Sequence, residues 1–160
     1  MALPPKQALR DELIARLEAD LAAAEAAQKA TVEGATHPEA KAEDDKDTRA
    51  LEQSYLARGQ AMRVEELRVA IGEVRAMSLR KFRDGDPIGL SAVVHFEEDE
   101  TEGVLFMAPE SGGAVLAEGQ VQVVTPKSAL GRALMKKRAG DECEVKLPKR
   151  TRNLVLTKVE

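Results

Sequence analysis

The sequence is poor in aromatic residues, cysteine and histidine. It contains no tryptophan, one tyrosine and three phenylalanines in 160 residues, so its cores should be small and built from aliphatic side chains. Its one cysteine, Cys143, cannot form a disulfide within the chain. With only His37 and His95 beside it, a zinc site made of cysteine and histidine alone is excluded.

Long apolar runs are also missing. No stretch approaches the roughly 18 apolar residues of a membrane-spanning helix, and nothing at the N-terminus resembles a signal peptide. We therefore expect a protein without membrane contact that works in a reducing cytoplasm. Its 24 basic and 28 acidic residues give a net charge of −4, which predicts a well-hydrated protein with no overall attraction to nucleic acid.

What the sequence does contain is a pair of mirrored heptad patterns in its first half. Apolar and glutamine positions at heptad spacing in residues 14–28 reflect, about Asp44, onto matching positions in residues 60–74. The paired positions are Ile14 with Val74, Leu17 with Ile71, Leu21 with Leu67, Ala24 with Val64, and Gln28 with Gln60. Two helices whose apolar seams match in this way should form an antiparallel hairpin. A bare coiled coil that only oligomerises would show the same pattern.

Proline, glycine and capping residues predict where these helices begin and end. The first helix should begin after Pro4–Pro5, because proline is tolerated in a first turn. Gly34 and Pro38 should interrupt it, and the capping-box spacing of Thr36 and Glu39 predicts a short helical turn over 37–43. The second helix should begin at Asp47 or Thr48, carry Leu56 on its apolar face and end near Met77–Ser78.

After a polar linker at 81–87 the hydrophobic period changes from helical to alternating. Short strands are predicted at 91–96, 103–107, 114–116, 121–124, 143–147 and 154–159, with a helix over 128–137. Cys143 should pack within the sheet. The predicted fold class is α+β: a coiled-coil hairpin over 1–79 with an acidic tip near 43–47, then a small antiparallel sheet domain with one helix over 80–160.

The C-terminal sequence resembles the bacterial GreA/GreB transcript-cleavage factors. Ser128-Ala-Leu-Gly-Arg132-Ala-Leu134-Met-Lys-Lys137, then Gly140-Asp141 and Val145-Lys-Leu-Pro148, is similar to the family's S-P-x-A-R-x-L-x-x-K, G/D-D and V-x-x-P pattern. Ala129 replaces the proline of that pattern and Gly131 its alanine. The resemblance implies an FKBP-like C-terminal domain.

The acidic centre of the hairpin is similar to the family's tip, G-D-L-K-E-N-A-E-Y. Asp44 takes the place of the aspartate, Lys46 that of the lysine, and Asp47 stands where glutamate is expected. The resemblance implies that Asp44 and Asp47 carry the cleavage function, with Glu43 and Asp45 as substitutes if the register is shifted. A few carboxylates cannot hold Mg²⁺ alone, but they can complete a weak site that a partner supplies.

The resemblance further implies the partner and the contacts. In this family the arm enters the secondary channel of RNA polymerase and stimulates the polymerase's own cleavage of the RNA 3′ end in backtracked complexes. The chain itself would be no enzyme, and Mg²⁺ would be held jointly with the polymerase. Contacts with RNA or polymerase are expected from five basic residues: Arg58, Arg63, Arg132, Lys136 and Lys137. We expect a monomer.

Two other functions compete with this hypothesis. Gre-like relatives with altered tips can occupy the same channel and inhibit the polymerase without promoting cleavage. An FKBP-like domain also raises the possibility of prolyl isomerase activity, but such a site needs an aromatic-lined pocket. Because Phe96 and Phe106 are the only aromatic residues beyond residue 84, isomerase activity is disfavoured.

Overall fold

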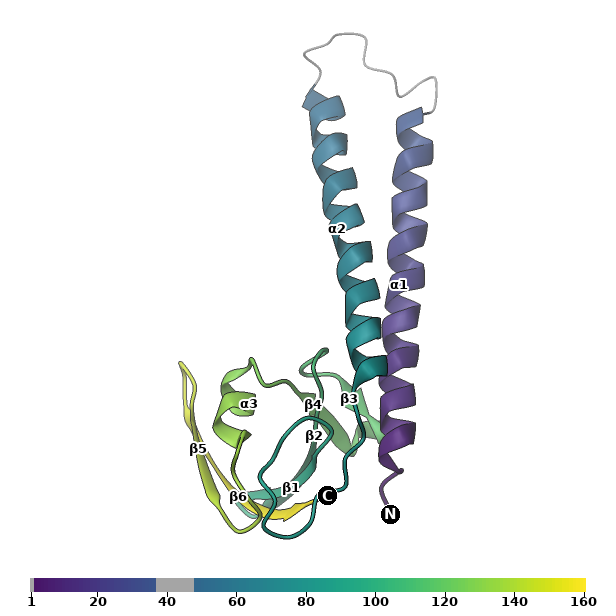
Figure 1. The fold of residues 1–160 in the computed structure, drawn as a ribbon. Helices are drawn as coiled ribbons and strands as arrows, with labels where there is room; N and C mark the ends of the chain where they lie inside the picture. Colours follow the sequence, from purple (N-terminus) through teal and green to yellow (C-terminus); the bar gives the residue numbers. More distant parts are fainter. Residues whose placement is uncertain (1, 37–47) are drawn as a thin grey trace. The chain divides into compact units, whose positions relative to one another are not determined.

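The computed structural model describes residues 2–36 and 48–160 (Figure 1). Two long helices precede a six-stranded sheet with one further helix. The chain divides into two compact units, one made of residues up to Ile14 together with Glu73–Glu160, the other of Ala15–Gly72. The division into domains at residue 79 stays a prediction.

Helix α1 spans Lys6–Thr36 and begins directly after Pro4–Pro5, as predicted. Its first turn closes when the amide of Leu9 donates to the carbonyl of Pro5 at 3.2 Å. The predicted interruption at Gly34 is wrong, because α1 continues through that residue. A single glycine costs a helix only about 1 kcal/mol relative to alanine, which is too little to break it. The predicted turn over 37–43 lies outside the described residues.

Helix α2 spans Thr48–Ala76, so both of its ends fall within two residues of the predicted ones. Whether Asp47 caps this helix lies outside the described residues. Contacts between α1 and α2, of Gln60 with Ala27 and of Arg68 with Glu25, confirm the predicted hairpin.

Within Ala15–Gly72, the buried positions of α1 and α2 confirm the mirrored seam. Leu17, Val64, Leu67 and Ile71 are buried, and the seam is crossed by an ion pair of 3.2 Å between Arg68 Nη2 and Glu25 Oε1. The predicted pair of Gln28 and Gln60 is half-buried, and the heptad continues beyond it through half-buried positions with little apolar surface: Thr31, Gln53 and Ala57. The placement of Leu56 on this face is wrong, since its side chain is 54% exposed and Ala57 takes the heptad position.

The sheet has the strand order β3-β4-β2-β1-β6-β5. Its strands are β1 Val93–Glu98, β2 Thr101–Met107, β3 Val115–Leu116, β4 Val121–Val124, β5 Glu142–Lys146 and β6 Thr151–Val159. The expectation of a wholly antiparallel sheet is wrong, because β2 and β4 pair in parallel. The short edge strand β3 pairs with β4 in antiparallel fashion. Because β3 reverses the direction of the chain between β2 and β4, β4 runs beside β2 in the same direction.

The core of the sheet domain is mostly aliphatic, as the composition predicts, with Phe82 and Phe106 as its buried aromatic residues. Cys143 is among its buried residues, and burial raises the pKa of the thiol. Phe96 in β1 lies against Gly103, its neighbour in β2, where an added Cβ would come 2.3 Å from the ring. This glycine therefore makes room for an aromatic ring on the sheet. In the described part of the chain, no helix is long and apolar enough to cross a membrane.

Helix α3 spans Ala129–Leu134 and is shorter than the predicted helix over 128–137. Ser128 is its N-cap: the Ser128 hydroxyl accepts a hydrogen bond from the amide of Gly131 at 3.0 Å and donates one to the carbonyl of Thr125 at 2.9 Å. The helix stops because Lys136 adopts a left-handed conformation with φ of 70°. The chain then pairs with Ile88, whose amide donates to the carbonyl of Lys137 at 2.8 Å.

Candidate functional site

The acidic residues predicted to act at the tip lie outside the described residues. Glu43, Asp44, Asp45 and Asp47 belong to the segment 37–47, which connects the end of α1 to the start of α2. By sequence this segment carries five acidic and two basic residues. Among the residues that the structure does describe, no group of three or more histidine, cysteine, aspartate or glutamate side chains is placed to hold a metal ion.

The described helix ends next to this segment combine a polar seam with exposed apolar side chains. Leu51, Tyr55 and Leu56 of α2 are each more than half exposed. Tyr55 lies beside Arg58, with 5.8 Å between the Arg58 guanidinium carbon and the ring centre, within the range of a cation–π contact. Arg58 and Arg63 are both exposed, and Arg63 Nη1 lies 3.9 Å from Glu66 Oε2. Their predicted contact with RNA or polymerase stays a prediction.

Gln60 is a polar defect in the seam. Its Nε2 donates to the carbonyl of Ala27 over 3.4 Å, while its buried Oε1 has no hydrogen-bond partner among the described residues. An unpaired buried acceptor costs about 1–3 kcal/mol. The hairpin is therefore less stable on the side of Gln60 toward the tip than at Leu67 and Ile71.

Replacing this glutamine by leucine should stabilise the hairpin. We expect Gln60→Leu to raise the free energy of unfolding by about 1 kcal/mol, because it removes the unpaired acceptor and adds apolar surface to the seam. Thermal unfolding followed by circular dichroism at 222 nm measures this. Gln7→Leu, the same substitution at an exposed position of α1, is the control and should have little effect. Equal or lower stability of Gln60→Leu would contradict the prediction.

The three basic residues predicted to make contacts in the C-terminal domain differ from Arg152, for which no contact was predicted. Arg132, Lys136 and Lys137 are exposed, on α3 and the turn that follows it. Arg152 instead forms a two-pronged ion pair with Glu98, with 2.8 Å from Nε to Oε2 and 2.9 Å from Nη2 to Oε1. This pair lowers the pKa of Glu98, and Arg152 is occupied in joining β6 to β1. The roles of Arg132, Lys136 and Lys137 stay predictions.

His95 behaves as a strand residue, as expected from its place in the sequence. Its Nε2 lies 2.8 Å from Oε2 of Glu160, the residue that follows β6, the neighbour of β1 in the sheet. Both this contact and the ion pair of Lys158 with the same carboxylate lower the pKa of Glu160. The sequence did not indicate this cluster.

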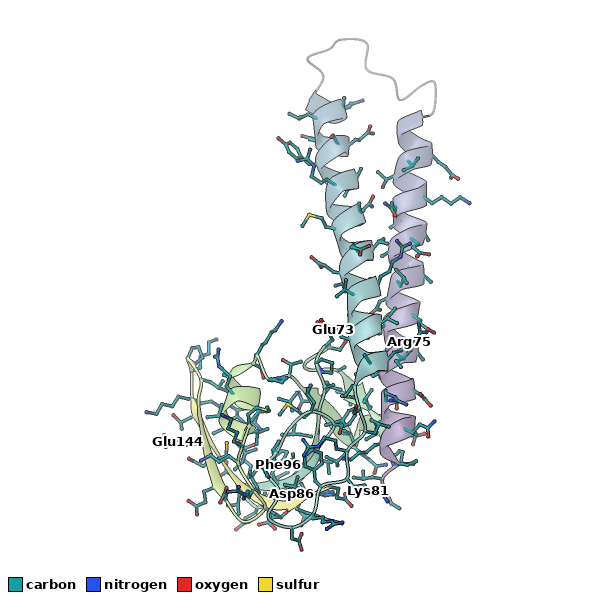
Figure 2. The ribbon with its side chains drawn as sticks, viewed as in Figure 1. Glu73, Arg75, Lys81, Asp86, Phe96 and Glu144 are labelled. Carbon is teal, nitrogen blue, oxygen red and sulfur yellow. The ribbon has the colours of Figure 1, made fainter. Side chains whose placement is uncertain are left out.

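Sequence reasoning also missed a pair of carboxyl groups. Glu73, near the end of α2 and labelled in Figure 2, shares a side-chain hydrogen bond with Glu110, which follows β2. Burial is the main cause that raises the pKa of Glu110, and the neighbouring Glu73 carboxyl adds to it. Two acids that are 37 positions apart carry no sequence signal, because only the tertiary fold brings them together.

The pair predicts a stability that falls as pH rises. Glu110 binds its proton more tightly in the folded chain than in the unfolded one, where glutamate has a pKa of about 4.3. Stability is therefore greatest below that value and declines as pH rises through the raised pKa. Glu110→Gln keeps a hydrogen-bond donor without the charge, so at pH 7 it should raise the unfolding temperature by about 2–4 °C.

The measurement is thermal unfolding of both proteins between pH 4 and pH 8. The gain from Glu110→Gln should vanish toward pH 4. Glu144→Gln on the exposed side of β5 removes the same charge and serves as the control. A Glu110→Gln protein that is less stable than wild type at pH 7 would show that the pair acts instead as an ion-binding or structural contact.

The family comparison agrees with the C-terminal motif. A family model described as "Transcription elongation factor, GreA/GreB, C-term" matches residues 84–160. The sheet domain is therefore that of the GreA/GreB transcription elongation factors. Residues 84–160 therefore belong to the GreA/GreB C-terminal domain family.

Solved structures with similar chains include GreA factor homolog 1 (Gfh1) of Thermus thermophilus, with 19% identity, 92% of this chain and 94% of that chain covered, and a TM-score of 0.40. Gfh1 of Thermus aquaticus follows with 18% identity, 91% and 92% coverage and a TM-score of 0.41. The GreA/GreB elongation factor of Nitrosomonas europaea shows 15% identity, 66% and 88% coverage and a TM-score of 0.36. No curated protein matches the chain significantly.

Proposed function

We propose that this transcription elongation factor binds RNA polymerase, inserts its hairpin into the secondary channel and stimulates the polymerase's own Mg²⁺-dependent cleavage of backtracked RNA. The observation that carries the proposal is the match of residues 84–160 to the GreA/GreB domain, directly after a two-helix hairpin. The reacting atoms would belong to the polymerase and the RNA 3′ end, so the chain would contribute groups to an active site that it does not itself contain.

The carboxylates at the tip suit this role by their chemistry. Asp44 and Asp47 would face a Mg²⁺ ion held jointly with the polymerase, and Glu43 and Asp45 are the alternates. Magnesium accepts one or two carboxylates and keeps several waters, so such residues can complete a site without forming one alone. The ion, when bound, supplies charge stabilisation at the phosphate under attack. The carboxylates of this chain would orient the ion and accept hydrogen bonds from its waters.

The rest of the chain would place the tip and bind the partner. The buried seam from Leu17 to Ile71 keeps the two helices together. Its continuation at Gln28 and Gln60 is polar, so this part of the hairpin can lie next to water. Arg58, Arg63, Arg132, Lys136 and Lys137 would contact polymerase or RNA, since each is exposed and has a charged end. The protein would act as a monomer and in the cytoplasm.

The experiment is cleavage of a 3′-labelled RNA in a stalled, backtracked polymerase complex with Mg²⁺. Rapid release of a short 3′ fragment on addition of the protein supports the proposal. Binding without release, or slower extension, favours a second candidate, an inhibitor that occupies the channel. One observation favours that candidate: Asp47 stands where the family has glutamate, and its carboxylate reaches one methylene less far. Absence of any binding to polymerase would exclude both.

A further inference from the structure

A buried aromatic ring in the linker between α2 and the sheet is surrounded by positive charge. Phe82 is 8% exposed. The Lys6 ammonium lies 4.6 Å from the centre of its ring, and the Arg80 guanidinium carbon lies 4.7 Å from it. The Lys6 ammonium also donates a hydrogen bond of 2.6 Å to the carbonyl of Arg80. Two cations therefore contact one ring.

A cavity of about 580 Å³ opens at this ring. Its lining includes five basic residues, namely Lys6, Arg80, Lys81, Arg83 and Lys158, and two acidic ones, Asp84 and Glu160. The lining therefore carries a formal charge of +3, in a chain whose net charge is −4. Such a local reversal of sign attracts anions.

Glu160, the acid whose charge acts on Lys6, already has other partners. Glu160 Oε1 lies 2.9 Å from Lys158 Nζ, and Oε2 lies 2.8 Å from His95 Nε2. Glu160 raises the pKa of Lys6, but burial and the charge of Arg80 outweigh it and lower that pKa to about 8. The ammonium of Lys6 is thus short of negative charge, and an anion in the cavity would supply it.

We propose that this cavity binds the phosphate groups of a small phosphorylated ligand, either pyrophosphate or the polyphosphate of a nucleotide. Several cations around one cavity match the charge and the multiple acceptor oxygens of a polyphosphate. Phe82 offers no stacking face to a base, because it is buried and lies under the two cations. Recognition is therefore through the phosphates. This proposal does not depend on the proposed action on RNA polymerase.

The test is titration calorimetry of the full-length protein with pyrophosphate, ADP and adenosine. Pyrophosphate should bind with a Kd of about 0.1–1 mM at low salt and more weakly at high salt. ADP should bind similarly if the nucleotide is the source of the phosphates, and adenosine should not bind. Binding of ADP and adenosine without binding of pyrophosphate would overturn the proposal, and so would no heat with pyrophosphate up to about 5 mM.

Substitutions at Lys6 locate the site. Lys6→Gln should weaken pyrophosphate binding about tenfold, whereas Lys6→Arg should retain it because the charge remains. Lys29→Gln removes one positive charge from the same helix at a side chain that is 80% exposed, and its Kd should equal that of wild type. Equal losses in Lys6→Gln and Lys29→Gln would show general charge attraction and overturn the site.

A second measurement does not depend on these variants. The pKa of the Lys6 ammonium, followed by ¹⁵N and ¹H resonances of the side chain, should rise from about 8 toward the ordinary lysine value of about 10.4 when pyrophosphate is added. A pKa that stays unchanged at saturating pyrophosphate would place the anion elsewhere and overturn the proposal.

Discussion

Cleavage of the labelled RNA should be lost when Asp44 and Asp47 are both replaced by alanine, while binding to the polymerase is unchanged. Stimulated cleavage should fall by about 100-fold or more, the size of effect seen when a charge-stabilising group is removed from an active site. Binding should persist because docking would use the helices and the sheet domain, whereas the carboxylates would act only on the ion and its waters. The measurement compares initial rates of 3′ fragment release at saturating protein.

A matched control separates chemistry from charge. Asp20→Ala with Glu65→Ala removes two acidic side chains from exposed positions on α1 and α2, so its net charge equals that of the double tip variant. The control should cleave at the wild-type rate. If the tip variant also retains cleavage, the carboxylates have no role in the chemistry. If both double variants lose polymerase binding, the effect is electrostatic docking. Separate Glu43→Ala and Asp45→Ala variants then establish the register.

The helical half of the fold could be predicted because a regular heptad repeat in the sequence marks the residues of the seam. Heptad spacing identified the buried and half-buried pairs from Leu17 with Ile71 to Gln28 with Gln60, and Pro4–Pro5 predicted the start of α1. The error at Leu56 arose because a large apolar residue was preferred over Ala57, although the heptad step selects the alanine. Where few apolar residues form the seam, the heptad spacing predicts the buried position better than the size of the apolar side chain does.

The direction of the sheet strands could not be predicted in the same way. Alternating patterns placed the six strands, but the parallel pairing of β2 with β4 joins strands that are not consecutive in the chain. Charged clusters were missed for the same reason. Lys6 and Arg80 are 74 positions apart, and nothing in either local sequence indicates the other. The tip acids lie outside the described residues and stay a prediction from the sequence.

Replacing Gly131 should destabilise the sheet domain strongly. An added Cβ at this position would lie 1.7 Å from the carbonyl oxygen of Thr125, far inside contact distance. It would also come 3.0 Å from Ser128 Oγ, which accepts a hydrogen bond from the Gly131 amide and caps α3. We expect Gly131→Ala to lower the free energy of unfolding by about 2–4 kcal/mol, as the sum of a weakened cap and forced overpacking.

Thermal unfolding of the 160-residue chain measures this loss as a fall of about 5–15 °C in its unfolding temperature. Gly72→Ala in α2 is the control, because nothing lies within 4 Å of its added Cβ, and it should be neutral or slightly stabilising. The GreA/GreB pattern has alanine at position 131 and proline at position 129, so Gly131 and Ala129 both depart from it. A Gly131→Ala protein as stable as wild type would show that the turn at Thr125 can shift to the family's arrangement. A strong loss would show that the close approach of Thr125 requires glycine in this chain.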